Sequence, residues 1–128
     1  MTKLAEILLP IRTKNPLNMS QGITRAGMFA RAKERKQQRY LASLAVSPGR
    51  VRLQDALLCG PLEVHLTRIA PSSGLDDDAL PASMKSIRDG VADAMGFTTD
   101  RHPLLLWKYA QARGKDYAVK VEIFGERP

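Results

Sequence analysis

The chain has 128 residues, of which 44% are hydrophobic and 26% charged, and its formal net charge is +7. These values predict one globular domain, residues 1–128, and no apolar run approaches the ~20 residues that a membrane-spanning helix needs. The N-terminus lacks the apolar core of a signal peptide, and the single cysteine, Cys59, cannot form an internal disulfide. We therefore expect a cytoplasmic protein that does not enter a membrane.

Positive charge is concentrated in the first part of the chain. Residues 1–52 carry eleven Lys or Arg and two acids, whereas the remaining residues carry nine Lys or Arg and eleven acids. A basic first part and a later acidic cluster suggest a surface that binds a polyanion beside a metal site. The alternative is a soluble protein that is simply basic.

The first predicted elements are a strand and a helix. Residues 4–12 read as a short strand, and residues 13–24 as a polar loop rich in turn residues. Residues 25–46 contain no Pro and are rich in Ala, Arg, Lys and Gln, which predicts a helix. At about 100° per residue, one sector of this helix is basic: Arg25, Arg35, Lys36 and Arg39. We expect a different sector to face the core: Tyr40, Leu41, Leu44 and Ala45.

The basic side chains of this region are candidate contacts to a nucleic-acid backbone. The candidates are Lys14, Arg31, Lys33, Arg35, Lys36 and Arg39. An ordinary solvated helix would also carry charged residues, but Glu34 is the one acid among residues 25–46. We therefore favour a helix that lies along phosphates.

The second half of the chain reads as strand, helix, strand, strand. Residues 50–61 fit either a short helix or a packed loop, and residues 62–69 alternate like a half-buried strand. Residues 79–95 have an apolar stripe at helical spacing and end before Gly96. Residues 104–110 and 117–124 read as strands that pair antiparallel with each other. The prediction is an α+β domain of order β-α-β-α-β-β, with a four-stranded mixed sheet and two main helices.

Three adjacent carboxylates, Asp76, Asp77 and Asp78, lie between the strand at 62–69 and the helix at 79–95. In an extended segment residues i and i+2 point the same way, so Asp76 and Asp78 can bind one ion while Asp77 points elsewhere. Mg²⁺ prefers carboxylate oxygens, and it can polarise a phosphate and activate a water molecule. The alternative is that these acids only cap the helix and stabilise its dipole.

A third carboxylate usually completes such a site, and Asp89 and Asp100 are the candidates. Asp89 lies about 16 Å along the helix from Asp78 at ~1.5 Å per residue, which is too far to share an ion directly. We prefer Asp100, because it follows the helix in a loop that can fold back. Lys85, about 10 Å from Asp78 by the same rise, can reach a phosphate. Lys85 and Asp89 also have the i, i+4 spacing of a plain surface pair.

These residues resemble the RusA family of Holliday-junction resolvases. The resemblance rests on Asp76-x-Asp78 before an amphipathic helix, Lys85 on that helix and Asp100 in the following loop. The element order and the Pro- and Asn-rich stretch at residues 9–18 are also similar to that family.

The resemblance implies a homodimeric endonuclease that nicks four-way DNA junctions symmetrically and needs Mg²⁺, with Mn²⁺ as a substitute. It implies that Asp76, Asp78 and Asp100 hold the metal and that Lys85 is the catalytic lysine. Because such proteins are often carried by phages and prophages, the expected location is the cytoplasm of a bacterial or phage-infected cell.

The chain also departs from the family's pattern. Lys85 follows the aspartates about one helical turn later than in the family, Ala79 stands where a polar residue is common, and the loop of Asp100 is less acidic. The alternative is therefore a non-catalytic protein that binds branched DNA on the same fold. A third possibility is a small structural or partner-binding protein whose acids only cap a helix.

Overall fold

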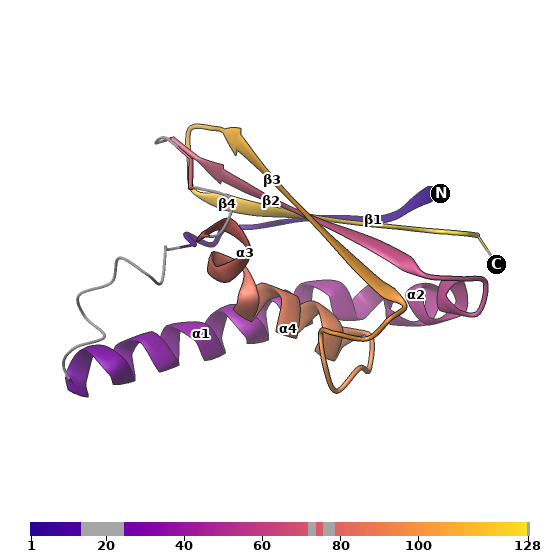
Figure 1. The fold of residues 1–128 in the computed structure, drawn as a ribbon, viewed down its shortest axis with the longest axis horizontal. Coiled ribbons are helices and arrows are strands. Elements are labelled where there is room, and N and C mark those ends of the chain that lie inside the picture. Colours follow the sequence, from indigo (N-terminus) through magenta and orange to yellow (C-terminus); the bar gives the residue numbers. More distant parts are fainter. Residues whose placement is uncertain (14–24, 72–73, 76–78, 128) are drawn as a thin grey trace.

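The computed structural model describes residues 1–13, 25–71, 74–75 and 79–127. Its elements in chain order are β1 (Thr2–Leu9), α1 (Arg25–Val46), the 3₁₀ turn η3 (Ser47–Gly49), α2 (Arg50–Leu57), β2 (Leu62–Ala70), α3 (Ala79–Ser83), α4 (Lys85–Ala94), β3 (Leu105–Arg113) and β4 (Ala118–Gly125). Figure 1 shows the strands as one layer with the helices on one side of it. The predicted α+β class and four-stranded mixed sheet are confirmed.

The order of strands in the sheet is β1-β4-β2-β3. β4 lies between β1 and β2 and pairs antiparallel with both, whereas β3 pairs with β2 in parallel. The prediction that the last two strands pair with each other is therefore wrong. β4 buries nearly every second residue and suits the centre, while β3 carries Lys108, Gln111 and Arg113 and suits an edge.

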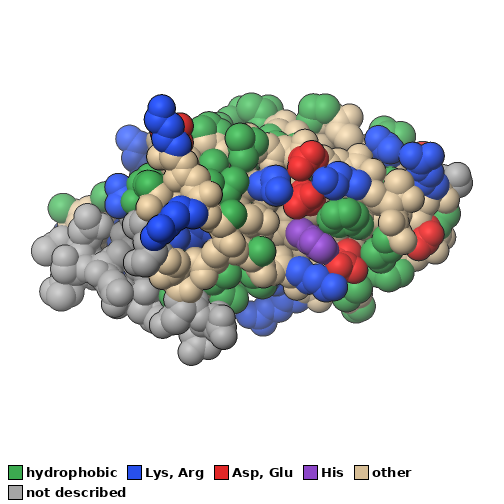
Figure 2. Space-filling model, turned by 90° about the horizontal axis from the view of Figure 1, so that it is seen from above, with side chains coloured by type: hydrophobic (Ala, Val, Ile, Leu, Met, Phe, Trp, Pro, Cys, Tyr) green, Lys and Arg blue, Asp and Glu red, His purple; other side chains and the backbone are tan. Residues whose placement is uncertain are grey.

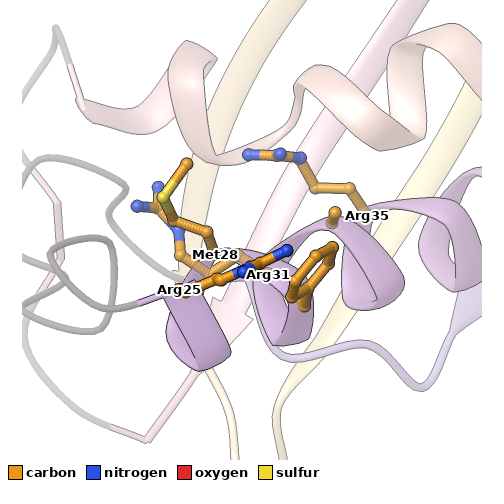
Figure 3. A pocket seen from close by; sticks show the side chains of 6 residues that line it. Arg25, Met28, Arg31 and Arg35 are labelled. Atoms are coloured by element: carbon orange, nitrogen blue, oxygen red, sulfur yellow. The ribbon is translucent and has the colours of Figure 1, made fainter.

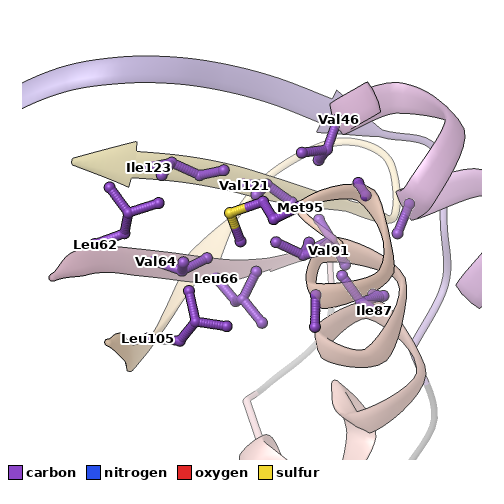
Figure 4. Packing of buried hydrophobic residues seen from close by; sticks show 14 of the residues in the cluster. Val46, Leu62, Val64, Leu66, Ile87, Val91, Met95, Leu105, Val121 and Ile123 are labelled. Carbon is purple, nitrogen blue, oxygen red and sulfur yellow. The ribbon is translucent and has the colours of Figure 1, made fainter. Parts of the chain in front are cut away.

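The core lies between the sheet and the helices. Figure 4 shows side chains of β2 and β4 packed with those of α4. The predicted alternation of the strand at 62–69 is confirmed, because Leu62, Val64 and Leu66 are fully buried. Ile87 and Val91 of the helical stripe are also fully buried. Each such side chain contributes about 1.5–3 kcal/mol through its burial, and this shared core fixes α4 against the sheet.

The helix predicted at residues 79–95 is divided in two. Met84 leaves the helical conformation, with φ −101° and ψ 1°, and its N–H donates to the Pro81 carbonyl at 3.1 Å. This is a tighter i→i−3 bond, so α3 and α4 are separate segments. The distances from Asp78 to Lys85 and Asp89 that were counted along one straight helix axis therefore do not apply, because the axis is interrupted at Met84. Gly96, with φ +86°, follows α4 in a left-handed conformation that favours glycine.

α1 has the predicted bounds but a different buried face. Ala42 and Val46 are buried. Of the four residues expected in the core, Ala45 is partly buried against it, whereas Tyr40, Leu41 and Leu44 are exposed. α1 approaches α4 closely, since a Cβ atom added to Gly90 would lie 2.3 Å from the Arg39 carbonyl oxygen. Small side chains fit this close crossing, and the large ones turn outward. None of the described helices is both long enough and apolar enough to cross a membrane.

The outer face of the sheet carries interleaved acids and bases, visible in Figure 2. Glu63 lies 2.7 Å from His65 Nε2 and 2.8 Å from Lys108 Nζ, and Glu122 lies 2.7 Å from Lys3 Nζ. The hydrogen bond from Lys108 and that from His65 hold the pKa of Glu63 below its usual value. These pairs suit a solvated sheet face, and the candidate site lies on the other side of the sheet, where β3 meets α4.

Candidate functional site

Asp100 is the buried acid of the loop that follows α4. Its side chain is 5% exposed, and its Oδ2 atom lies 2.8 Å from Lys85 Nζ and 3.1 Å from Arg88 Nε. The loop does fold back against α4. The expected position of Asp100 beside Asp76 and Asp78 falls outside the described residues. Trp107 of β3 fixes this position, because its indole N–H donates to the Asp100 carbonyl oxygen at 2.7 Å.

The two cations keep Asp100 ionised. Burial alone would raise the pKa of this carboxyl, but the contact with Lys85 and the charge of Arg88 outweigh it and hold the pKa below its ordinary value. Asp100 is therefore an anion at neutral pH, which is the form that binds a cation.

We predict that Asp100→Asn lowers the free energy of unfolding most at neutral pH. Because the folded-state pKa is depressed, the stabilisation is complete above the ordinary pKa of 3.8 and is lost as the pH falls through the lower folded-state value. Urea unfolding of both proteins between about pH 7 and pH 2 measures this difference. Asp116→Asn, at an exposed turn, is the control. If the difference in unfolding free energy between the wild type and Asp100→Asn stayed constant with pH, or grew in acid, the depressed pKa of Asp100 would be contradicted.

Lys85 connects two carboxylates. Its Nζ atom lies 2.9 Å from Asp89 Oδ1 and 2.8 Å from Asp100 Oδ2. Burial acts to lower the pKa of Lys85, but the contacts with Asp100 and Asp89 outweigh it and raise the pKa above its ordinary value. Lys85 therefore stays an ammonium ion at neutral pH. It can bind an anion or stabilise negative charge, but it is not a general base.

Arg88 is a site residue that the sequence reasoning missed. Its guanidinium lies 4.8 Å from the centroid of the Trp107 ring and donates a hydrogen bond to the Tyr109 hydroxyl. The ion pair of its Nε with Asp100 lacks the geometry of a hydrogen bond, so this buried atom has no hydrogen-bond partner. The available signal was an Arg beside the apolar stripe, together with Trp107 and Tyr109 on one face of a strand.

β3 also fixes the residue that leads into the acidic triplet. The side-chain amide of Gln111 donates to the Leu75 carbonyl at 2.6 Å, and its oxygen accepts from the Leu75 N–H at 2.7 Å. The inward face of β3 thus holds Leu75 through Gln111, Arg88 through Tyr109 and the loop of Asp100 through Trp107. Asp76 and Asp78 lie outside the described residues.

A basic hollow of about 250 Å³ adjoins Lys85. The residues that line it include Arg35, Lys36 and Arg39 from α1 and Lys85, Ser86 and Asp89 from α4. Arg39 binds Asp93 with two hydrogen bonds of 2.6 and 2.8 Å, and its NH1 lies 4.0 Å from Asp89. α1 is thereby joined to the helix that carries Lys85. The hollow can accept an anion such as a phosphate.

The remaining predicted phosphate contacts lie elsewhere. Arg31 lines a second hollow on α1, and Lys33 is exposed on the same helix. Lys14 lies outside the described residues.

A metal site cannot be built from the described residues alone. Among residues 1–13, 25–71, 74–75 and 79–127, no three His, Cys, Asp or Glu side chains gather as metal ligands. Asp100 suits the role of a metal ligand because its carboxylate is ionised. In this structure its Oδ2 atom contacts Lys85 and Arg88. A metal site that includes Asp100 would therefore need further ligands from outside this part of the chain, where the predicted ligands Asp76 and Asp78 lie.

Comparison of the chain with protein-family models and with curated proteins found no match in either set.

Proposed function

We propose that this protein is a metal-dependent endonuclease that resolves Holliday junctions or related branched DNA by paired nicks. The observation that carries the proposal is the position of Lys85. This ammonium ion contacts the buried Asp100 at 2.8 Å and also lines a hollow with Arg35, Lys36 and Arg39. An anionic backbone bound in that hollow would lie beside a lysine and an ionised carboxylate. The resemblance to the RusA family supports the same activity.

The residues divide into those that bind and those that act on the phosphate. Arg35 and Lys36 hold the DNA backbone, and Arg39 is oriented for the same task by Asp93. Asp76, Asp78 and Asp100 would hold Mg²⁺, with Mn²⁺ as a substitute. When bound, this ion supplies Lewis-acid activation of the phosphate and of a water molecule. Lys85 leaves its carboxylate partners to stabilise the charge that develops on the leaving oxygen.

The expected partners are a four-way or other branched DNA and a second copy of the chain. Two paired nicks require two equivalent sites, and a two-fold dimer supplies them. The predicted setting is the cytoplasm of a bacterial or phage-infected cell.

The test is nicking of a synthetic four-way junction in Mg²⁺. The wild type should nick the junction in Mg²⁺ or Mn²⁺ and should not nick it in a chelator, and Asp78→Asn should abolish cleavage. Asp77→Asn is the matched control, because the alternation of an extended segment predicts that Asp77 does not share the face of Asp76 and Asp78 and should be dispensable. Equal cleavage by the wild type and Asp78→Asn would sink the assigned role of Asp78.

A second candidate is a non-catalytic protein that binds branched DNA. It is favoured by the ion pairs of Asp100, whose charge is already compensated by Lys85 and Arg88. This candidate predicts tight, salt-sensitive binding of the junction without nicking in either metal. The same assay, with binding and cleavage measured separately, distinguishes the two candidates.

A further inference from the structure

The first half of α1 presents a basic and apolar surface of which the proposed cleavage uses only Arg35. A hollow of about 540 Å³ there is lined by Arg25, Met28, Phe29, Arg31, Ala32 and Arg35 (Figure 3). Ala32 and Arg35 also line the smaller hollow beside Lys85. The two hollows therefore form one continuous surface from Arg25 to Lys85, which we call the α1 track.

The α1 track combines arginines that form no ion pair within the described part of the chain with an exposed aromatic ring. Within the described residues no ion pair joins Arg25, Arg31 or Arg35 to an acid, unlike Arg39. Phe29 is 65% exposed, and the guanidinium of Arg25 lies 5.7 Å from the centroid of its ring. Basic groups that alternate with an exposed aromatic ring form the surface on which unpaired bases stack.

We propose that the α1 track binds a single, unpaired DNA strand that leads away from the cleavage site. Phe29 stacks against a base, and Arg25, Arg31 and Arg35 contact the phosphates. This inference rests on the proposed function and narrows its substrate to branched DNA with an unpaired arm. From Arg25 to Arg39 the helix rises about 21 Å, which equals about six nucleotides for a strand that keeps the duplex rise of ~3.4 Å each.

A duplex or a second copy of the chain fits the α1 track less well. The bases of a duplex are already stacked on each other and offer no face to Phe29. A two-fold contact through this surface would set Arg25, Arg31 and Arg35 against the same cations of the partner, which opposes association. A single strand complements both the charge and the ring.

The experiment measures binding without divalent metal, so that it is independent of cleavage. Fluorescence anisotropy compares an oligothymidine strand with a blunt duplex of equal length, both in a chelator. Phe29→Ala should weaken binding of the strand at least about fivefold and change binding of the duplex less than about twofold. Phe29→Trp should restore binding of the strand because it keeps an aromatic face.

Tyr40→Ala is the matched control. Tyr40 is also 65% exposed on α1 and does not line either hollow of the α1 track. The affinity of Tyr40→Ala for the strand should lie within about twofold of the wild-type affinity.

Three results would overturn the inference: unchanged strand binding by Phe29→Ala, an equal loss with Tyr40→Ala, or an equal loss for the duplex. A wild type that nicks junctions, combined with any of these, would leave the proposed function standing while the inference fails. Strand binding that depends on Phe29 in a protein that does not nick junctions would support the inference and contradict the proposed function.

Discussion

Lys85→Met should reduce nicking of a four-way junction by about 10²- to 10³-fold. The raised pKa of Lys85 keeps it an ammonium ion, so its contribution is electrostatic stabilisation of the leaving oxygen. Methionine has a similar length and carries no charge. The measurement is the single-turnover cleavage rate at saturating protein, because this condition separates the chemical step from DNA binding.

Lys108→Met is the matched control for this loss. Lys108 also makes an ion pair of 2.8 Å with a carboxylate, but its partner Glu63 lies on the outer face of the sheet. Its variant should cleave within about twofold of the wild type, because an exposed pair contributes little to stability. Similar rates for Lys85→Met and the wild type, or equal losses in both variants, would refute the role of Lys85.

The return of the Asp100 loop to α4 was predictable from local signals, whereas the contact of Asp100 with Lys85 was not predicted. The apolar stripe that includes Ile87 and Val91 fixed which face of the helix meets the sheet, and Gly96 marked where the helix ends. A helix lying on the sheet must be followed by a loop that turns back, and Asp100 lies in that loop. The proposed metal ligands Asp76 and Asp78 lie outside the described residues, so their assignment stays a prediction.

The features that the sequence did not reveal depend on long-range pairing. β4 pairs with β1 along one edge and with β2 along the other, so neither edge of β4 is free to pair with β3. β3 pairs with β2 instead. No local pattern in residues 104–124 encodes that choice. The role of Arg88 follows from it, since Trp107 and Tyr109 meet this guanidinium only because β3 lies at that edge. The outward turn of Tyr40 likewise depends on Gly90, a residue fifty positions away.

Gly90→Ala should destabilise the protein and also weaken its binding of DNA. A Cβ atom at this position would lie 2.3 Å from the Arg39 carbonyl oxygen and 2.8 Å from Ala42 Cβ. A backbone atom cannot move aside as a flexible side chain can, so α1 and α4 must separate. Overpacking of this kind costs about 1–3 kcal/mol, measured by urea unfolding. Separation would also widen the hollow that Arg35 and Lys85 line.

Gly49→Ala is the control that tests whether the close crossing of α1 and α4 causes the losses expected in Gly90→Ala. Gly49 precedes α2, and its nearest neighbour to an added Cβ atom is Leu53 Cδ1 at 4.0 Å. With that space and a negative φ, alanine should leave stability unchanged or raise it by about 0.4–1 kcal/mol. The weaker DNA binding of Gly90→Ala should persist under conditions where the variant is fully folded, because it arises from displaced helices. Unfolding and DNA binding that match the wild type in Gly90→Ala would show that α1 and α4 adjust without cost. The link between the helix crossing and the basic hollow would then fail.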